Sequence, residues 1–293
     1  MKKHNFKIKY MLLGLFGLSL GLSQLGQPTT VQAASDKLNI VTTTDFYGEV
    51  AKAVVGKYGK VTSIINSPNV DPHDFEPTTK TAKTVANSDL VLYNGVGYDS
   101  WVKKLGGKKY LAVGTIMKTK DGQNEHLWYK KDTMKKTANY LAKQYGKLDP
   151  KHQKQFTKNA KNYIKKLAKL DTQLAAIKKQ AKGQKVAVSE PVFDYALKAM
   201  GYQIINQHFA KATEEGADPS YSDIKKLQTA IKKKEIAFFV ANKQSDSKVI
   251  ENIIELCHKN DIPVVKVTET LPKKQTYVKW MSSQYQQIID LQK

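Results

Sequence analysis

One sustained apolar stripe divides this chain into two parts. Between Asp149 and Lys182 the apolar residues recur at alternating spacings of four and three, at Phe156, Ala160, Tyr163, Leu167, Leu170, Leu174 and Ile177. This is the repeat of one face of an α-helix. Pro150 in its first turn and Gly183 after its last turn indicate its ends. We favour a long helix lying across a globular body over a coiled coil, because the repeat occurs only once.

Strand and helix patterns alternate on both sides of this stripe. Strands are predicted at 38–44, 61–65, 89–95, 110–113, 185–188, 202–205, 236–240 and 264–267, with helical patterns between most of them. Such alternation is typical of parallel sheets covered by helices. We therefore predict an α/β fold with two Rossmann-like lobes, each with a parallel sheet, joined by one long rigid α-helix. The lobes would span 36–146 and 184–293, and the linker helix 147–183.

The N-terminus has the pattern of a signal peptide, which we place at residues 1–34. Four lysines precede the apolar segment Met11–Leu22, and Val31-Gln32-Ala33 gives the small residues of a cleavage site. The single cysteine, Cys257, excludes an intrachain disulfide and lies far from this segment, so a lipid-modified N-terminal cysteine is not expected. We expect an exported protein, extracellular or associated with the cell surface.

The formal net charge of +22 is carried almost wholly by lysine. Lysines spread along helices usually form a solvated surface, and the sequence has no stripe of arginine and aromatic residues, so nucleic acid is not an expected partner. An anionic envelope surface is a further candidate partner. With 41% hydrophobic and 25% charged residues, the chain is not globally disordered.

Four candidate metal ligands follow predicted strands. His73 lies in the loop Asp71-Pro72-His73-Asp74-Phe75-Glu76-Pro77 after the second strand, and His126 lies after the fourth. Glu190 and Glu269 each follow a strand of the second lobe. Ligands of open α/β sheets bind beyond the carboxyl ends of strands. Two imidazoles and two carboxylates form a mixed nitrogen and oxygen shell that suits a divalent first-row ion.

Each of these residues also has a structural interpretation. His73 alone is compatible with a solvated loop, and His126, before Leu127-Trp128-Tyr129, with a histidine packed under an aromatic lid. Glu190 and Glu269 are both compatible with helix caps. The metal hypothesis gains weight because all four occupy matching places in the two lobes.

The motifs resemble those of the metal-binding receptors of bacterial ABC importers for zinc or manganese, the cluster A-I solute-binding proteins. The His73 loop is similar to the DPH-x-[YF]-EP signature of that family, and Ser88–Gly95 to its AD-L-V-x-x-NG strand. Glu125-His126-Leu127-Trp128 resembles its PH-x-W segment, and Glu190–Tyr195 its [HE]-x-x-F-x-Y segment. The resemblance implies two lobes bridged by a long helix, with His73, His126, Glu190 and Glu269 as metal ligands.

The resemblance further implies a function. The protein would bind Mn²⁺ or Zn²⁺ between its lobes and deliver it to a membrane permease, as a monomer and not as an enzyme. Glu190 at the third position and the absence of a His-rich loop favour Mn²⁺, whereas Glu269 stands where manganese receptors usually have aspartate. A metal-dependent hydrolase and a surface adhesin that uses the basic surface are the alternatives; four protein ligands leave no place for the water that hydrolysis needs.

Overall fold

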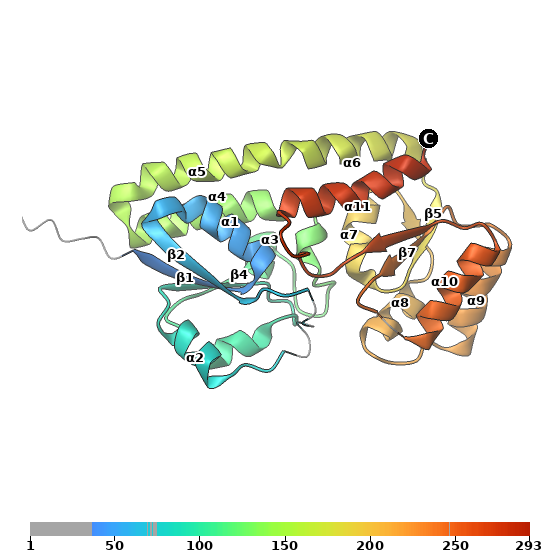
Figure 1. Ribbon diagram of the computed structural model, residues 1–293, viewed down its shortest axis with the longest axis horizontal. Coiled ribbons are helices and arrows are strands. Elements are labelled where there is room, and N and C mark those ends of the chain that lie inside the picture. Colours follow the sequence, from blue (N-terminus) through green and yellow to red (C-terminus); the bar gives the residue numbers. More distant parts are fainter. Residues whose placement is uncertain (1–36, 69, 71, 73–74, 246) are drawn as a thin grey trace, which may run out of the picture. The chain divides into compact units, whose positions relative to one another are not determined.

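The computed structural model describes residues 37–293 except 69, 71, 73, 74 and 246. Two parallel four-stranded sheets form its framework, with strand orders β2-β1-β3-β4 and β6-β5-β7-β8 (Figure 1). The first sheet consists of β1 (Leu38–Thr44), β2 (Gly59–Ile65), β3 (Leu90–Tyr93) and β4 (Tyr110–Ala112). The second consists of β5 (Lys185–Val188), β6 (Gln203–Ile204), β7 (Phe239–Asn242) and β8 (Val264–Val267). The two orders are equivalent, and the predicted α/β class with two parallel sheets is confirmed.

Helices lie between the strands of each half and follow the last strand of each sheet. The first half has α1 (Asp45–Val55), α2 (Thr79–Ala86), α3 (Val113–Met117) and α4 (Thr133–Leu148). The second has α7 (Asp194–Met200), α8 (Gln207–Glu214), α9 (Tyr221–Lys232), α10 (Lys248–Lys259) and α11 (Tyr277–Leu291). Short 3-10 turns are η1 (Gly56–Tyr58), η2 (Ser100–Leu105), η3 (Leu127–Tyr129), η4 (Pro150–His152) and η5 (Pro191–Phe193).

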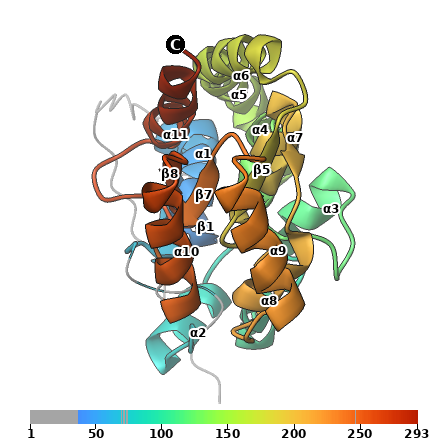
Figure 2. The same ribbon diagram turned by 90° about the vertical axis from the view of Figure 1, so that its right-hand side faces the viewer.

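The predicted long helix is present as α5 (Gln153–Lys166) and α6 (Ala168–Ala181). Leu167 separates them, but its φ of −75° and ψ of −13° remain right-handed, so the two helices run end to end. Figures 1 and 2 both show α11 lying beside this pair. Six of the seven apolar stripe positions lie within α5 and α6, Leu167 joins them, and all seven are buried. The hydrophobic period therefore predicted correctly which face of this helix packs inward.

The largest hydrophobic cluster of the described chain contains residues from both halves, and a smaller cluster lies within each half. In the first half, the rings of Phe46 and Trp128 pack at a tilt, with their centroids 4.8 Å apart. Tyr129 packs against Phe193 of the second half at 5.0 Å, and Phe46 packs against Trp280 of α11 at 5.8 Å. The backbone N–H of Tyr277 also donates to Glu49 Oε2 of α1 at 2.7 Å. Residues 37–293 form one compact unit that shares this cluster, so the lobe and linker limits at 36–146, 147–183 and 184–293 remain predictions.

Several strand limits differ from those predicted. The strand predicted at 236–240 is β7, which begins three residues later and extends to Asn242. A helix that was not predicted, α8, follows the strand predicted at 202–205. The proposed signal segment lies outside the described residues, and no helix within the described part is long and apolar enough to cross a membrane.

Candidate metal site

His126 lies at the start of η3 and is completely buried. Asn124 Oδ1 accepts its backbone N–H at 2.9 Å and lies 3.0 Å from its ring Nδ1. A carboxamide oxygen is an acceptor only, so this contact places a proton on Nδ1, and in the neutral ring Nε2 then carries the lone pair. A neutral imidazole oriented in this way is the usual form of a metal-binding histidine.

The loop before His126 is held by side chains at the carboxyl end of β3. Asn94 Nδ2 donates to the carbonyl of Glu125 at 2.9 Å, and Tyr47 donates its hydroxyl proton to Asn94 Oδ1 at 2.6 Å. Asp99 in turn accepts the backbone N–H groups of Asn94 at 2.7 Å and Gly95 at 2.8 Å. Burial raises the pKa of Asp99 to about 6, although these hydrogen bonds oppose the rise. The local sequence therefore builds a fixed support for the loop that carries His126.

Asn124 also connects the first lobe to the second. Its Nδ2 donates to the carbonyl of Pro191 at 2.7 Å, and its own carbonyl accepts the hydroxyl of Tyr195 at 2.9 Å. One side chain thus orients the imidazole and fastens its loop to the segment after β5. Partners that orient a metal-binding histidine typically contribute about 10–100-fold to affinity.

We expect Asn124→Ala to weaken metal binding by about 10–100-fold, because the variant loses both the acceptor for Nδ1 and the link to Pro191. Isothermal titration with Mn²⁺ and Zn²⁺ measures the change. The neighbouring exposed residue supplies the control: Gln123→Ala should bind as the unchanged protein does. Equal affinities for both variants would show that Asn124 does not orient the site.

The second lobe places Glu190 and Glu269 directly beyond strands, as predicted. Glu190 comes two residues after β5, and its Oε2 accepts a hydrogen bond from Asn242 Nδ2 at 2.7 Å. Glu269 comes two residues after β8, is only 7% exposed, and its backbone N–H donates to Gln244 Oε1 at 2.7 Å. Burial, followed by the nearby charge of Glu269, raises the pKa of Tyr98 well above its usual value.

Tyr98 therefore links Glu269 of the second lobe to the surroundings of His126. Its ring packs against the imidazole with the centroids 6.4 Å apart. Glu269 thus lies one side chain away from His126. The remaining predicted ligand, His73, lies outside the described residues.

The structure brings together a different set of donors around His126. Among the described residues, one group of three metal-binding side chains has ligand atoms within 4.8 Å of one another, namely Glu125, His126 and Glu214. His126 Nδ1 lies 3.5 Å from Glu214 Oε1. Glu190 and Glu269 are not part of this group, so the predicted set of four remains a prediction.

Glu214 belongs to α8, the helix that the sequence analysis did not predict. A signal was present: Asn206, Phe209, Ala210 and Thr213 follow helical spacing, and the first three of them are buried. The side chain that α8 brings to His126 is Glu214, which is about one-tenth exposed.

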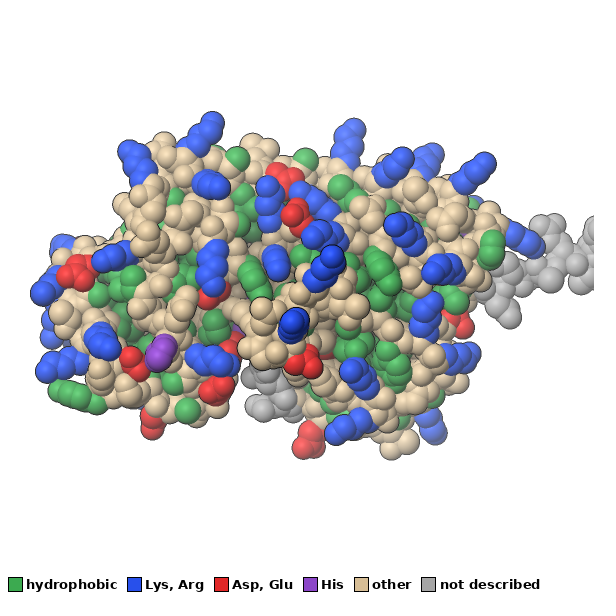
Figure 3. All heavy atoms as spheres, turned by 180° about the vertical axis from the view of Figure 1, so that it is seen from behind, with side chains coloured by type: hydrophobic (Ala, Val, Ile, Leu, Met, Phe, Trp, Pro, Cys, Tyr) green, Lys and Arg blue, Asp and Glu red, His purple; other side chains and the backbone are tan. Residues whose placement is uncertain are grey.

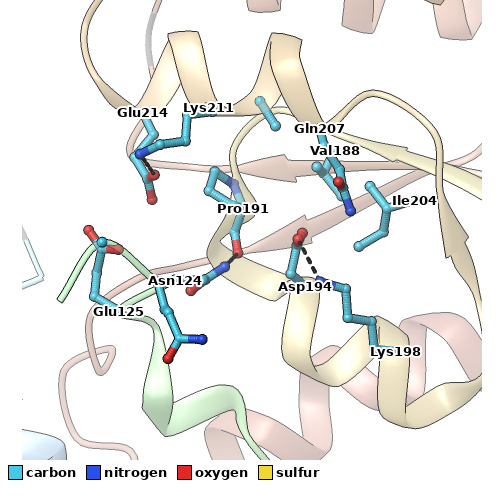
Figure 4. A pocket seen from close by; sticks show the side chains of 13 residues that line it. Asn124, Glu125, Val188, Pro191, Asp194, Lys198, Ile204, Gln207, Lys211 and Glu214 are labelled. Atoms are coloured by element: carbon cyan, nitrogen blue, oxygen red, sulfur yellow. Dashed lines mark hydrogen bonds and ion pairs between the residues drawn. The ribbon is translucent and has the colours of Figure 1, made fainter. Parts of the chain in front are cut away.

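A cavity of about 190 Å³ adjoins this group (Figure 4). The loop 122–125 lines one side, and α7 and α8 line the other. The carboxylates of Glu125 and Glu214 lie at one end, whereas Asp194 and its partner Lys198 lie toward the other, with Oδ2 and Nζ 3.6 Å apart. Burial raises the pKa of Asp194 to about 6, and Lys198 lowers it only in part.

Asp194 should make stability depend on pH. Its pKa in the folded protein lies above the usual 3.8, so the folded state holds this proton more tightly than the unfolded chain. The resulting stabilisation is complete below pH 4 and is lost as pH rises to about 6. Urea unfolding of the wild type and Asp194→Asn should diverge by about 2–3 kcal/mol over this range, in favour of the variant at pH 7. Asp218→Asn, at an exposed position, is the control; a curve for Asp194→Asn that parallels the wild type would contradict the assignment.

Comparison with known proteins identifies the family. Residues 40–291 match the family described as zinc-uptake complex component A, periplasmic (ZnuA). The manganese ABC transporter substrate-binding lipoprotein PsaA of Streptococcus pneumoniae is 30% identical over 216 residues, covering 67% of this chain and 69% of PsaA. The iron ABC transporter substrate-binding lipoprotein MtsA of Streptococcus pyogenes is 29% identical over 289 residues, covering 90% of each chain.

Solved structures share the fold. The periplasmic zinc-binding protein TroA from Treponema pallidum superposes with a TM-score of 0.72 at 19% identity, covering 87% of this chain and 99% of TroA. FpvC of Pseudomonas aeruginosa, solved with Mn²⁺, gives a TM-score of 0.72 at 21% identity over 87% of this chain and 98% of its own. The chain therefore belongs to the ZnuA family, the cluster A-I solute-binding proteins of ABC importers that its motifs resemble.

Proposed function

We propose that this protein is the extracytoplasmic receptor of an ABC importer that captures Mn²⁺ or Zn²⁺ and delivers it to the membrane permease. The observation that carries the proposal is the buried imidazole of His126, together with the carboxylates of Glu190 and Glu269 directly beyond strands β5 and β8. A neutral imidazole surrounded by carboxylates suits a divalent ion of intermediate hardness. Family membership supports the same function, because the relatives named above are substrate-binding components of metal transporters.

We propose His73, His126, Glu190 and Glu269 as the ligands of the transported ion. Two histidines and two carboxylates would hold one cation between the lobes. The lobes share an aromatic core, and α5, α6 and α11 pass along both, so closure around the ion would be small. Binding would require deprotonated ligands and would weaken in acid.

Titration with metal tests this proposal. Calorimetry should give one tight site per chain for Mn²⁺ and for Zn²⁺, and Glu190→Gln should weaken it strongly. Glu255→Gln is the control, since Glu255 lies on α10 away from the site. Competition between the two ions would then identify the cargo, with the expectation that intrinsic affinity favours Zn²⁺ over Mn²⁺. A protein that binds neither ion would refute the proposal.

An enzymatic role is not part of this proposal. Four protein ligands would occupy a tetrahedral shell and leave no position for a reactive water. Hydrolysis that depends on added metal and is lost in His126→Ala would favour the metallohydrolase instead.

We also propose that the basic surface contacts an anionic envelope surface in the exported protein. Ten lysines lie on the exposed faces of η4, α5, α6 and the residue after α6: 151, 154, 158, 161, 165, 166, 169, 178, 179 and 182. Figure 3 shows lysines spread over the whole visible face and not gathered in one patch. Such a distribution supports weak, salt-dependent attraction. Co-sedimentation with anionic vesicles at 50 mM and 500 mM NaCl tests it, and retention that is equal at both would contradict it.

A further inference from the structure

We propose that Glu125, His126 and Glu214 form a second coordination position, a loading position that the cation occupies before it reaches the four ligands proposed above. The inference rests on the proposed function and adds residues to it. Two of the three, Glu125 and Glu214, are not among the ligands that the motifs imply.

Geometry is the first support. The three side chains place one ligand atom each within 4.8 Å of the others, so small side-chain adjustments would bring all three to usual metal bond lengths of about 2.0–2.2 Å. They come from two elements far apart in sequence: the loop before η3 and the last residue of α8. Glu214 is about one-tenth exposed and His126 is buried, so the group is part of the packed structure and not a chance cluster on the surface.

Charge is the second support. Glu125 and Glu214 place two carboxylates at one end of the cavity, beside an imidazole, and such oxygen and nitrogen donors suit a divalent cation. Elsewhere the protein is strongly basic, with a formal charge of +22, so a local acidic position is needed to attract a cation.

The adjoining cavity is the third support. Its volume of about 190 Å³ has room for several water molecules, each of which takes about 30 Å³ in the liquid. A partly hydrated ion therefore fits beside Glu125 and Glu214, which both line the cavity (Figure 4).

His126 belongs to both positions, through its two ring nitrogens. In the loading position the ion would bind Nδ1, the nitrogen 3.5 Å from Glu214 Oε1, and the contact of Nδ1 with Asn124 Oδ1 would open to admit it. At the four proposed ligands the ion would bind Nε2, and the contact with Asn124 would be restored. The ion would thus move by exchanging ligands around one imidazole.

A triple variant isolates the loading position. His73→Ala, Glu190→Gln and Glu269→Gln together remove the other proposed ligands and retain Glu125, His126 and Glu214. We expect this variant to bind one Mn²⁺ weakly, measured as the loss of the free-ion signal in electron paramagnetic resonance. Adding Glu214→Gln should lower the residual affinity by at least about tenfold. Adding Glu215→Gln, the neighbouring carboxylate at 59% exposure, should not change it.

Kinetics provide a second test in an otherwise unchanged protein. Trp128 packs against the imidazole with centroids 5.1 Å apart, so its fluorescence should report metal arrival in a stopped-flow experiment. Glu214→Gln should slow Mn²⁺ association several-fold, and Glu215→Gln should not.

The outcomes separate this inference from the proposed function. Failure of the wild type to bind metal refutes the function itself. If the wild type binds tightly but Glu214→Gln and Glu215→Gln associate with Mn²⁺ at the same rate, only the loading position is refuted. The inference would also be overturned if the triple variant bound no ion while the single variant Glu214→Gln had reduced equilibrium affinity. Glu214 would then be a positioning residue for His126.

Discussion

His126→Ala is expected to abolish tight binding of Mn²⁺ and Zn²⁺. The imidazole is the side chain shared by both proposed positions, and no other described histidine is close enough to the group of Glu125 and Glu214 to replace it. The loss should exceed the roughly 10–100-fold that removal of an orienting partner causes. Isothermal titration with each metal measures it.

His208→Ala is the matched control for this variant. His208 lies on α8, the helix that carries Glu214, but it is exposed. Its replacement should leave the affinity unchanged, and thermal melting should show both variants folded. If His126→Ala retained the wild-type affinity, the placement of the site would be wrong.

The second large effect is expected on stability. Trp128 is completely buried, and its ring lies 4.8 Å from Phe46, 4.9 Å from Tyr98 and 5.1 Å from His126, measured between centroids. Its backbone carbonyl accepts the hydroxyl of Tyr277 from the second lobe at 2.5 Å. Trp128→Ala leaves a large void in this core and should lower the free energy of unfolding by about 3–5 kcal/mol.

Urea denaturation followed by circular dichroism measures this change. Trp101→Ala is the comparison, because Trp101 is only partly buried and lies outside the aromatic group around Trp128; its ring packs against Phe75 at 4.7 Å. It should cost less than Trp128→Ala. Equal losses would mean that the aromatic core around Trp128 does not hold the two lobes together.

The fold was largely predictable because its signals are local. Buried parallel strands appear as short apolar runs such as Val186–Val188, and the stripe from Phe156 to Ile177 has helical period over its whole length. The order of strands and helices then fixes the class. The positions of Glu190 and Glu269 were predictable for the same reason, since each directly follows a strand.

Contacts between distant segments were not predictable in this way. Glu214 reaches His126 only because α8 forms, and α8 is a short helix of eight residues with only two of them buried. No local period shows that Asn124 bonds to Pro191, 67 residues later in the chain. Strand limits such as that of β7 shifted because tertiary packing, and not propensity alone, determines where a ladder ends.

The central claim is that a divalent cation binds at His126 with carboxylates supplied by the second lobe. Anomalous diffraction from crystals grown with Zn²⁺ tests it most directly. We expect a peak about 2.0–2.2 Å from a ring nitrogen of His126 and from at least one carboxylate oxygen of Glu190, Glu269 or Glu214. A zinc-saturated protein with no peak within bonding distance of His126 would show that the metal binds elsewhere.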